Sequence, residues 1–380
     1  MIEKKEAIER ARRAIEEVKA GRMVILVDDE DRENEGDLAM AAELVTPEAI
    51  TFMATRACGL ICLTLSPKQV SRLDLPMMVQ SNRSPLQTAF TISIEAAKGV
   101  STGISAADRA HTIKVASDPA ATADSIVSPG HVFPLRAMPG GVLQRTGQTE
   151  GSVDLARLAG LTPSGVICEI MKPDGTMARM PDLRTFAAKH DLVIVSIADL
   201  IEYRLQHDRL VEKVASYEME LGEGNRKAMF NAHVYNAAPG ILRREYVALS
   251  LGDVDDGDWV PVRGHVACMA DDVLGARTRK TSPTAREVID AIIGRGRGVM
   301  LYLPSRETIG EELAACMGET SPSSARGDRE GEIREYGIGA QILLDLGVQK
   351  LQMISNNPHK LVGLEAWGFE ATEQVRLEEV

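Results

Sequence analysis

The chain has 380 residues, 44% of them hydrophobic, with 43 Lys and Arg against 55 Asp and Glu and a formal net charge of −12. That length suits two domains of ordinary size. An acidic chain lacks the basic face that nucleic acids and anionic membranes require, so we expect neither partner. The sequence has no apolar run of roughly 18 residues to span a membrane. The charged first 17 residues and an odd number of cysteines (five) predict a reduced, cytoplasmic protein.

Expected helices and strands alternate through the first half of the chain. Apolar residues at helical spacing predict a helix over 2–20, and the run 23–27 predicts a buried strand. Helix starts are expected after Thr46, Ser66, Ser105 and Thr149 as N-caps. Further strands are expected at 59–65, 90–94, 165–171 and 192–197, with a helix between the last two. This alternation predicts a layered α/β (α+β) domain with a mixed sheet over residues 1–208.

A polar segment at 207–227 is the expected boundary between two domains. A second series of elements follows it. Strand-like residues cover 234–251 with a turn at Pro239-Gly240, a helix is expected near 284–293, and another strand at 299–303. We therefore assign a second α/β domain to residues 209–380.

An acidic run, DDEDRENEGD at 28–37, follows directly after the first predicted strand. A solvated surface loop is one interpretation of such a run. However, α/β proteins bind ligands beyond the carboxyl ends of strands, and clustered carboxylates raise each other's pKa unless a cation is present. Carboxylate oxygens are also the ligands that Mg²⁺ prefers. The position and composition of the run favour a cation site.

Three further features suggest chemistry. Residues 145–150, RTGQTE, combine an arginine, a hydroxyl and an expected helix start, which suits phosphate binding, although capping alone explains Thr149 and Glu150. His131 lies in a loop bounded by glycine and proline, where an ordinary surface role is the more frequent one. Glu169 interrupts an apolar strand. It lies either on a solvated face or buried with a raised pKa, and spacing alone leaves both open.

Six runs stand out: DDEDRENEGD (28–37), LDLPMMV (73–79), TISIEAAKGVSTGISAADR (91–109), SPGHVFPLRA (128–137), GGVLQRTGQTE (140–150) and GVICEIMKPDGTMAR (165–179). Through them, residues 5–208 closely resemble 3,4-dihydroxy-2-butanone 4-phosphate synthase, a lyase of riboflavin biosynthesis. The resemblance implies conversion of ribulose 5-phosphate to L-3,4-dihydroxy-2-butanone 4-phosphate and formate with Mg²⁺ or Mn²⁺, through an enediolate. It also implies a homodimer with sites at the interface.

The resemblance also assigns roles to individual residues. It implies that Cys62 lines the pocket. The implied catalytic residues are His131, Glu169, Glu35 and Asp37, and the implied metal ligands are Glu33 and Gln148. The implied substrate-binding residues are Arg32, Glu33, Asp37, Thr102, Asp108, Arg145, Thr146, Gly147, Gln148, Thr149 and Glu169.

Gln148 is a departure from the family, which has a metal-binding histidine at this position. An amide oxygen is a hard ligand that Mg²⁺ accepts, whereas imidazole also suits softer ions. We therefore expect retained activity with a weaker preference for Mn²⁺, and Gln148→His should change the metal dependence.

Residues 213–380 resemble GTP cyclohydrolase II, most clearly at 246–253, 297–303 and 334–370. That family binds zinc through three cysteines. Here Cys268 matches the first, whereas Thr278 and Lys280 replace the others, and Lys280 would place a cation against Zn²⁺. The nucleotide loop is shortened at 304–308. Glu332 stands where the family has an aspartate, and Arg334 matches a catalytic arginine of the family. We expect no zinc and a domain without cyclohydrolase activity.

Two other functions compete with this interpretation. One is a bifunctional enzyme that still hydrolyses GTP through another metal arrangement. The other is a non-catalytic regulator that binds sugar phosphate or guanine nucleotide. The presence of both implied turnover residues, His131 and Glu169, favours the synthase, because a protein that only binds has no need of them.

Overall fold

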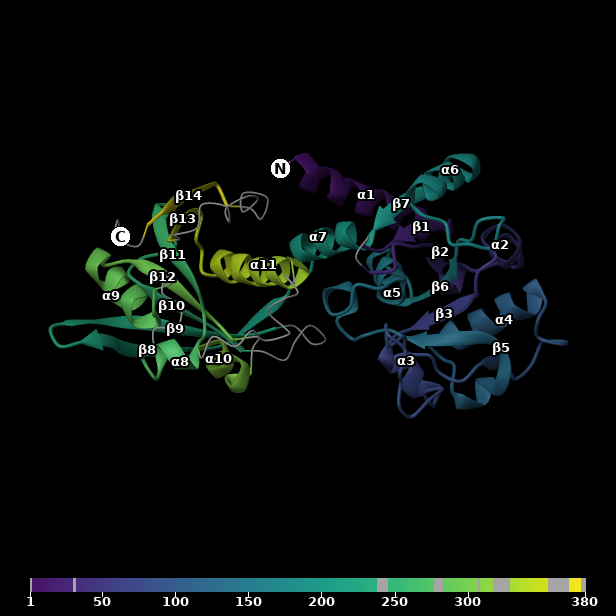
Figure 1. The fold of residues 1–380 in the computed structure, drawn as a ribbon, viewed down its shortest axis with the longest axis horizontal. Coiled ribbons are helices and arrows are strands. Elements are labelled where there is room, and N and C mark those ends of the chain that lie inside the picture. The colour runs from purple at the N-terminus through teal and green to yellow at the C-terminus, as the bar shows by residue number, and fades with distance from the viewer. Residues whose placement is uncertain are drawn as a thin grey trace. The chain divides into compact units, whose positions relative to one another are not determined.

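The structure is a computed structural model that describes residues 2–29, 32–237, 245–276, 283–305, 308–316, 329–354 and 369–376. The chain divides into two compact units, Ile2–Arg204 and Leu205–Val380, and Figure 1 labels their elements. Each unit contains a seven-stranded sheet with parallel and antiparallel pairs, so the predicted α/β class is confirmed. Within the described part of the chain, no helix has both the length and the apolar character to cross a bilayer.

The sheet of the N-terminal unit has the order β4-β5-β3-β6-β2-β1-β7. The β1–β7 and β3–β5 pairs are parallel, and the other neighbours are antiparallel. The strands are β1 (Val24–Val27), β2 (Gly36–Ala41), β3 (Cys62–Leu65), β4 (Ile94–Ala96), β5 (Ile126–Arg136), β6 (Ser164–Glu169) and β7 (Val193–Ser196).

The helices of this unit begin largely where the sequence predicts. Thr46, Ser66 and Ser105 each accept a backbone N–H as N-caps, as expected. The prediction for Thr149 is wrong, because Gly147 is the N-cap and α5 begins at Gln148. A Cβ at position 147 would collide with the Arg145 guanidinium, so a larger residue there would require this side chain to shift. The helices are α1 (Ile2–Lys19), α2 (Pro47–Phe52), α3 (Pro67–Arg72), α4 (Ala106–Ser117), α5 (Gln148–Leu158), α6 (Met180–His190) and α7 (Ile197–His207).

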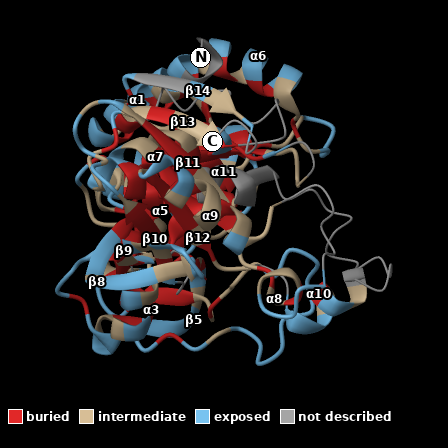
Figure 2. Ribbon diagram, turned by 90° about the vertical axis from the view of Figure 1, so that its left-hand side faces the viewer, coloured by how far each residue is buried: buried red, intermediate tan, exposed pale blue. Residues whose placement is uncertain are grey.

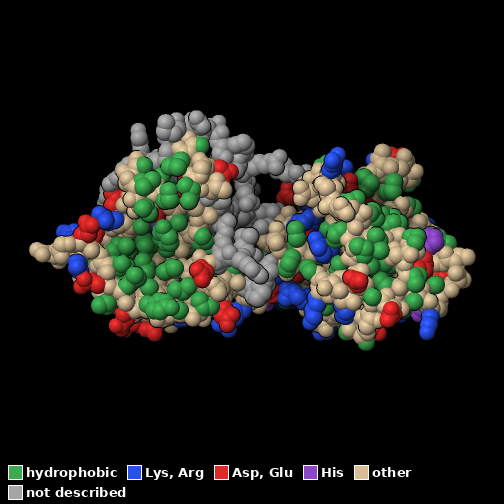
Figure 3. Space-filling model, turned by 90° about the horizontal axis from the view of Figure 1, so that it is seen from below, with side chains coloured by type: hydrophobic (Ala, Val, Ile, Leu, Met, Phe, Trp, Pro, Cys, Tyr) green, Lys and Arg blue, Asp and Glu red, His purple; other side chains and the backbone are tan. Residues whose placement is uncertain are grey.

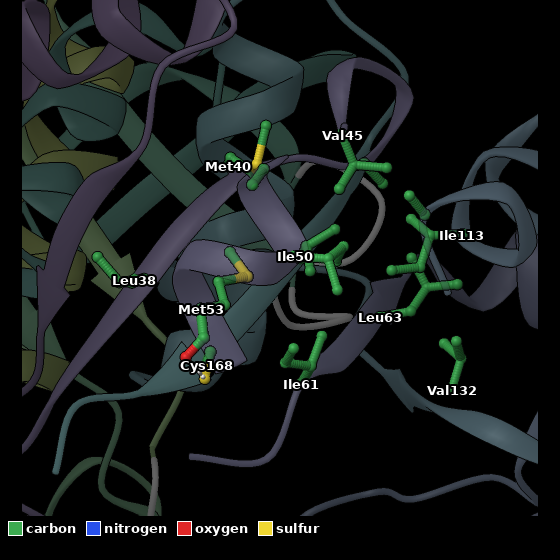
Figure 4. Packing of buried hydrophobic residues seen from close by; sticks show 14 of the residues in the cluster. Leu38, Met40, Val45, Ile50, Met53, Ile61, Leu63, Ile113, Val132 and Cys168 are labelled. Carbon is green, nitrogen blue, oxygen red and sulfur yellow. Dashed lines mark hydrogen bonds between the residues drawn. The ribbon is translucent and has the colours of Figure 1, made fainter. Parts of the chain in front are cut away.

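The two faces of the N-terminal sheet pack against different partners. One face holds the main apolar core, in which Leu38, Leu63 and Cys168 lie near side chains of α2 and α4 (Figure 4). The opposite face packs against α5, which approaches closely because Gly151 has no side chain. A Cβ there would lie 2.7 Å from a methyl group of Leu26 on β1. Because successive side chains of each strand point to opposite faces, every second residue faces the core and the others face α5.

The sheet of the C-terminal unit has the order β14-β13-β11-β12-β10-β9-β8. Phe230, Val288, Ile292 and Met300 form a core between the sheet and α9. The strands are β8 (Val211–Glu223), β9 (Arg226–Ala237), β10 (Glu245–Leu251), β11 (Trp259–Val266), β12 (Gly298–Leu303), β13 (Lys350–Ile354) and β14 (Ala371–Val375), and the helices are α8 (Met269–Asp272), α9 (Ala285–Arg295), α10 (Ile309–Cys316) and α11 (Arg329–Asp345).

The polar segment 207–227 has regular structure in this unit. It comprises the end of α7, all of β8 and the start of β9. β8 is an edge strand that is exposed along most of its length (Figure 2), and a strand exposed on both faces lacks the apolar alternation that identifies strands in sequence. Exposed hydrophobic side chains occur on the surface of this unit (Figure 3). Val214, Tyr217 and Met219 of β8 and Met229 of β9 are exposed.

Candidate active site

Strand register brings three predicted residues to one end and one face of the N-terminal sheet. Asp37 on β2 is the cross-strand partner of Glu169 on β6. Cys62 on β3 pairs with Ile167 on one side and with Phe133 on the other. His131 and Glu169 lie two residues beyond these partners, toward the same end. Two strand spacings amount to about 10 Å, so the register places the backbones of His131 and Glu169 on either side of Leu60, whose N–H donates to Glu169 Oε2.

This row lies on the face that α5 covers. Leu26, which contacts the α5 position Gly151, is the cross-strand partner of Asp37. Side chains at paired positions point to the same face, and residues two apart do so as well. Cys62 therefore lies on the site face, whereas Cys168 belongs to the core of the opposite face.

The acidic segment between β1 and β2 is organised by Asp28. One Asp28 oxygen accepts from the backbone N–H of Glu35 (2.9 Å), and the other accepts from the N–H of Glu33 (3.1 Å) and from Arg32 Nη1 (2.7 Å). Arg179 donates to the carbonyl oxygens of Glu33 and Asn34. Hydrogen bonds from side chains therefore hold this loop in a defined conformation, unlike a loosely solvated surface loop. Residues 30 and 31 of the acidic run lie outside the described residues.

Negative charge accumulates at this end of the sheet. Burial raises the pKa of Asp37 well above its usual value, and the neighbouring carboxylates of Glu169 and Glu33 raise it further. Burial also raises the pKa of Glu33, although Arg32 partly opposes this. The pKa of Glu35 is raised as well, by burial and then by Glu33. Carboxylates that repel one another in a buried place are stabilised by a cation.

The N-terminus of α5 carries the second predicted group. Arg145 Nη1 contacts Glu150 Oε2 at 2.6 Å, and the other Glu150 oxygen accepts from the Met138 N–H. Gln148 and Thr149 are buried in the first turn of the helix, where backbone N–H groups lack intrahelical acceptors. Gln148 Oε1 accepts from Arg32 Nη1 at 2.9 Å. This contact joins the acidic segment to α5.

His131 is held by a carboxylate that the sequence reasoning did not single out. Glu95 Oε2 lies 2.9 Å from His131 Nδ1 and 3.2 Å from the His131 backbone N. Glu95 is buried beneath Gly103, where a Cβ would collide with its carboxyl group. The sequence signal was a charged residue inside the alternating apolar run 90–96. It was missed because only the fold shows that this residue faces His131.

Thr102 and Asp108 lie in a different environment. Asp108 accepts from Ser101 Oγ (2.7 Å) and from the backbone N–H groups of Ser101 and Gly103. The Ser101 hydroxyl hydrogen bond is the main cause that lowers the pKa of Asp108. Asp108 thus shapes the loop that carries the exposed Thr102, and substrate contact by either residue stays a prediction.

Only some of the residues that the sequence analysis matched to GTP cyclohydrolase II are among the described residues of the C-terminal unit. Cys268 is buried as the N-cap of α8, and its backbone N–H donates to Asp272 (3.1 Å). Thr278 and Lys280 lie outside the described residues, as do 306 and 307 of the shortened loop and the side chains of Glu332 and Arg334. Cys58, Cys62, Cys168 and Cys268 are free thiols.

The donor set near Asp37 fits a hard divalent cation. Mg²⁺ typically uses one or two carboxylates and keeps several waters, and the carboxylates gathered here have pKa values raised by burial first and by one another's charges second. Among the described residues, no three His, Cys, Asp or Glu side chains form a closed metal cluster. An open site completed by water and substrate oxygens is consistent with both observations.

These features define a class: a two-domain α/β protein in which a buried helix N-terminus carrying an arginine lies beside carboxylates on one face of a sheet. The family model of 3,4-dihydroxy-2-butanone 4-phosphate synthase matches residues 12–203, and that of GTP cyclohydrolase II matches residues 214–376. The riboflavin biosynthesis protein RibBA of Aquifex aeolicus is 49% identical over 373 residues, covering 95% of this chain and 90% of the relative. RibBA of Salinispora arenicola is 44% identical, covering 96% and 87%.

Two solved structures are also similar. RibBX of A. baumannii, described as a two-domain 3,4-dihydroxy-2-butanone 4-phosphate synthase, has a TM-score of 0.77 at 39% identity and covers 96% of this chain and 98% of its own. A synthase in complex with two magnesium ions has a TM-score of 0.50 at 41% identity, covering 52% and 97%. The chain belongs to the RibBA family, in which this synthase is fused to a GTP cyclohydrolase II domain, and it is a 3,4-dihydroxy-2-butanone 4-phosphate synthase of riboflavin biosynthesis.

Proposed function

We propose that the N-terminal unit converts ribulose 5-phosphate to L-3,4-dihydroxy-2-butanone 4-phosphate and formate with Mg²⁺ or Mn²⁺. We further propose that the C-terminal unit binds no zinc and hydrolyses no GTP, and that the protein is a cytoplasmic homodimer. The observation that carries the proposal is the row of His131, Glu169 and Asp37 on one face, beside the N-terminus of α5.

Glu33 is the residue that would hold the metal, with Glu35 and Asp37 close enough for their charges to affect it. A related synthase was solved with two magnesium ions. A divalent ion at this place would supply charge stabilisation to an enediolate after proton loss at C3 of the sugar. It would also reduce the repulsion that raises the pKa of Asp37.

The phosphate takes no part in bond changes and serves as an anchor. Arg145 is fixed by Glu150 at 2.6 Å, so its guanidinium presents a defined orientation. The first N–H groups of α5 add partial positive charge at the same place. Arg32, in the acidic segment, offers a second guanidinium. Anchoring the phosphate fixes the distance of the reacting carbons from the acid and base.

His131 and Glu169 are suited to proton transfer on opposite sides of the sugar. Since Glu95 engages His131 Nδ1, Nε2 is the ring nitrogen available to take and return a proton. Glu169 Oε2 accepts from the backbone N–H of Leu60 at 2.8 Å, which fixes the carboxylate in place. Loss of the C1 hydroxyl, the carbon shift and formate release need an acid and a base that exchange roles.

The C-terminal proposal rests on chemistry. Thr278 and Lys280 in place of two cysteines leave Cys268 as one thiolate of the three that would bind zinc. Without a metal to activate water, attack on the guanine ring has no evident nucleophile. The second candidate is a bifunctional enzyme, which the cyclohydrolase match over 214–376 and the RibBA relatives favour.

One experiment tests both units. The full-length protein is incubated with ribulose 5-phosphate and Mg²⁺ and assayed for formate, and in parallel with GTP and Zn²⁺ and assayed for pyrophosphate. We expect formate, its loss in excess chelator, and no pyrophosphate. Pyrophosphate together with stoichiometric zinc would support the bifunctional enzyme, and absence of formate would support a regulator. Size-exclusion chromatography with light scattering tests the dimer.

A further inference from the structure

The amide of Gln148 has a fixed orientation. Gln148 is the first residue of α5 and is 5% exposed. Its Oε1 lies 2.9 Å from Arg32 Nη1. A guanidinium can only donate hydrogen bonds, so the amide atom that faces it must be the oxygen. The amide nitrogen, Nε2, is buried and has no hydrogen-bond partner within the described parts of the chain.

This orientation is unfavourable for metal binding. The oxygen is the only atom of a glutamine side chain that can ligate a hard cation, and here it accepts from a positively charged group. A divalent ion on the same oxygen would lie within a few ångströms of the guanidinium, where like charges repel strongly, and the neutral amide, unlike the Glu33 carboxylate that also contacts Arg32, has no negative charge to offset that repulsion. The remaining polar atom, Nε2, carries hydrogens and cannot act as a ligand.

We propose that Gln148 does not bind the metal and is a positioning residue for Arg32, an inference that rests on the proposed function. Arg32 Nη1 also contacts Asp28 at 2.7 Å, and its Nη2 lies 3.1 Å from Glu33. These two partners belong to the same segment as Arg32. Gln148 is the partner that comes from α5, so it ties the guanidinium to the phosphate-binding end of the helix.

Such a link favours binding of the sugar phosphate. An arginine side chain loses considerable rotamer freedom when it is immobilised on a ligand. Arg32 has already lost that freedom, because three groups hold its planar guanidinium. An arginine held in this way loses little further conformational entropy when it binds an anionic substrate.

The test uses binding measurements that need no turnover. Mn²⁺ binding to the sugar-free protein and ribulose 5-phosphate binding in excess chelator are both measured by calorimetry. We expect Gln148→Ala to leave the Mn²⁺ affinity within about twofold of wild type and to weaken sugar-phosphate binding about tenfold, the usual size of coupling within one hydrogen-bond network. In an Arg32→Ala background, Gln148→Ala should add less than about twofold.

Conservative variants provide the controls. Gln148→Glu keeps the acceptor for Arg32 and should retain sugar-phosphate affinity better than Gln148→Ala does. Gln69 is a matched control, because it is also buried with an unpartnered Nε2 among the described residues and an oxygen occupied by Ser66. Gln69→Glu keeps its capping acceptor and should change neither affinity.

Two results would overturn the proposal. The first is a loss of Mn²⁺ affinity of tenfold or more in Gln148→Ala, which would make Gln148 a metal ligand. The second is full additivity of the Arg32 and Gln148 substitutions on sugar-phosphate affinity. Failure of the wild type to produce formate would contradict the proposed function instead, and the Mn²⁺ titration of Gln148→Ala would still distinguish a ligand from a positioning residue.

Discussion

The two units each contain an aspartate whose side chain is largely buried among titratable groups, and the two aspartates differ in how they are satisfied. In the C-terminal unit, Asp272 accepts from His265 at 2.9 Å, from the hydroxyl of Tyr302, and from the backbone N–H groups of Cys268 and Ala285. Burial tends to raise the pKa of Asp272, but these hydrogen bonds hold it below its ordinary value. In the N-terminal unit, burial and neighbouring carboxylates raise the pKa of Asp37.

This difference separates a structural cluster from a site for a ligand. Asp272 has its lone pairs satisfied within the unit, so its charge stabilises the fold with no further group. Asp37 lies among like charges that only a cation from outside can compensate. Buried charges that remain uncompensated cost stability, and proteins retain them chiefly where function requires them.

The largest expected effect comes from the two residues that are suited to proton transfer. Glu169→Gln and His131→Ala should each lower the rate of formate production by roughly 10²–10⁴-fold, because each removes a proton-transfer group. Formate release and thermal unfolding are measured side by side. A variant that turns over at the wild-type rate would remove its residue from the mechanism.

A smaller effect is expected at Glu95, which acts through His131. Glu95→Gln keeps the shape of the side chain but replaces the carboxylate that contacts His131 Nδ1 and orients the imidazole. We expect kcat to fall by about 10- to 100-fold with little change in KM, as for other groups that orient a reacting residue. Glu95→Asp should recover part of kcat. If unfolding of the variant at the assay temperature accounted for the whole fall in kcat, Glu95 would have a purely structural role.

The smallest effects form a matched pair that tests the comparison directly. The raised pKa of Asp37 means that its stabilising contribution is present below the unfolded-state pKa of about 3.9 and is lost as pH rises through the folded-state pKa. In chelator at pH 8, Asp37→Asn should therefore raise the free energy of unfolding by about 1 kcal/mol. The gain should shrink toward pH 4.

Asp272→Asn should have the opposite sign. Because the folded-state pKa of Asp272 is lowered, its contribution is present above about pH 3.9 and is lost as pH falls through the folded-state pKa. The variant should lose on the order of 1–3 kcal/mol at neutral pH, with less loss in acid. Urea unfolding at several pH values measures both variants. Equal signs for the two substitutions would contradict the distinction between them.

The sequence predicted the α/β class, the places of most helices and strands, and the family of each half. Periodicity and capping signals act locally, so Thr46 and Ser66 could be identified as caps without the fold. The start of α5 was misplaced because Gly147 is the N-cap through its extended backbone conformation, with no side chain to mark it as a cap in the sequence. The exposed edge strand β8 was assigned to a domain boundary, since two solvated faces erase the apolar pattern of a strand.

The sequence by itself therefore determined which chemical groups this protein carries and in which elements they lie. The tertiary structure alone decided which of them meet. Register across β2, β6, β3 and β5 places Asp37, Glu169 and His131 in one row, and the pairing of Glu95 with His131 and of Gln148 with Arg32 follows from packing between distant segments. The physical reason is that hydrogen bonds and charge repulsion depend on distances of a few ångströms, and only the folded chain fixes those distances.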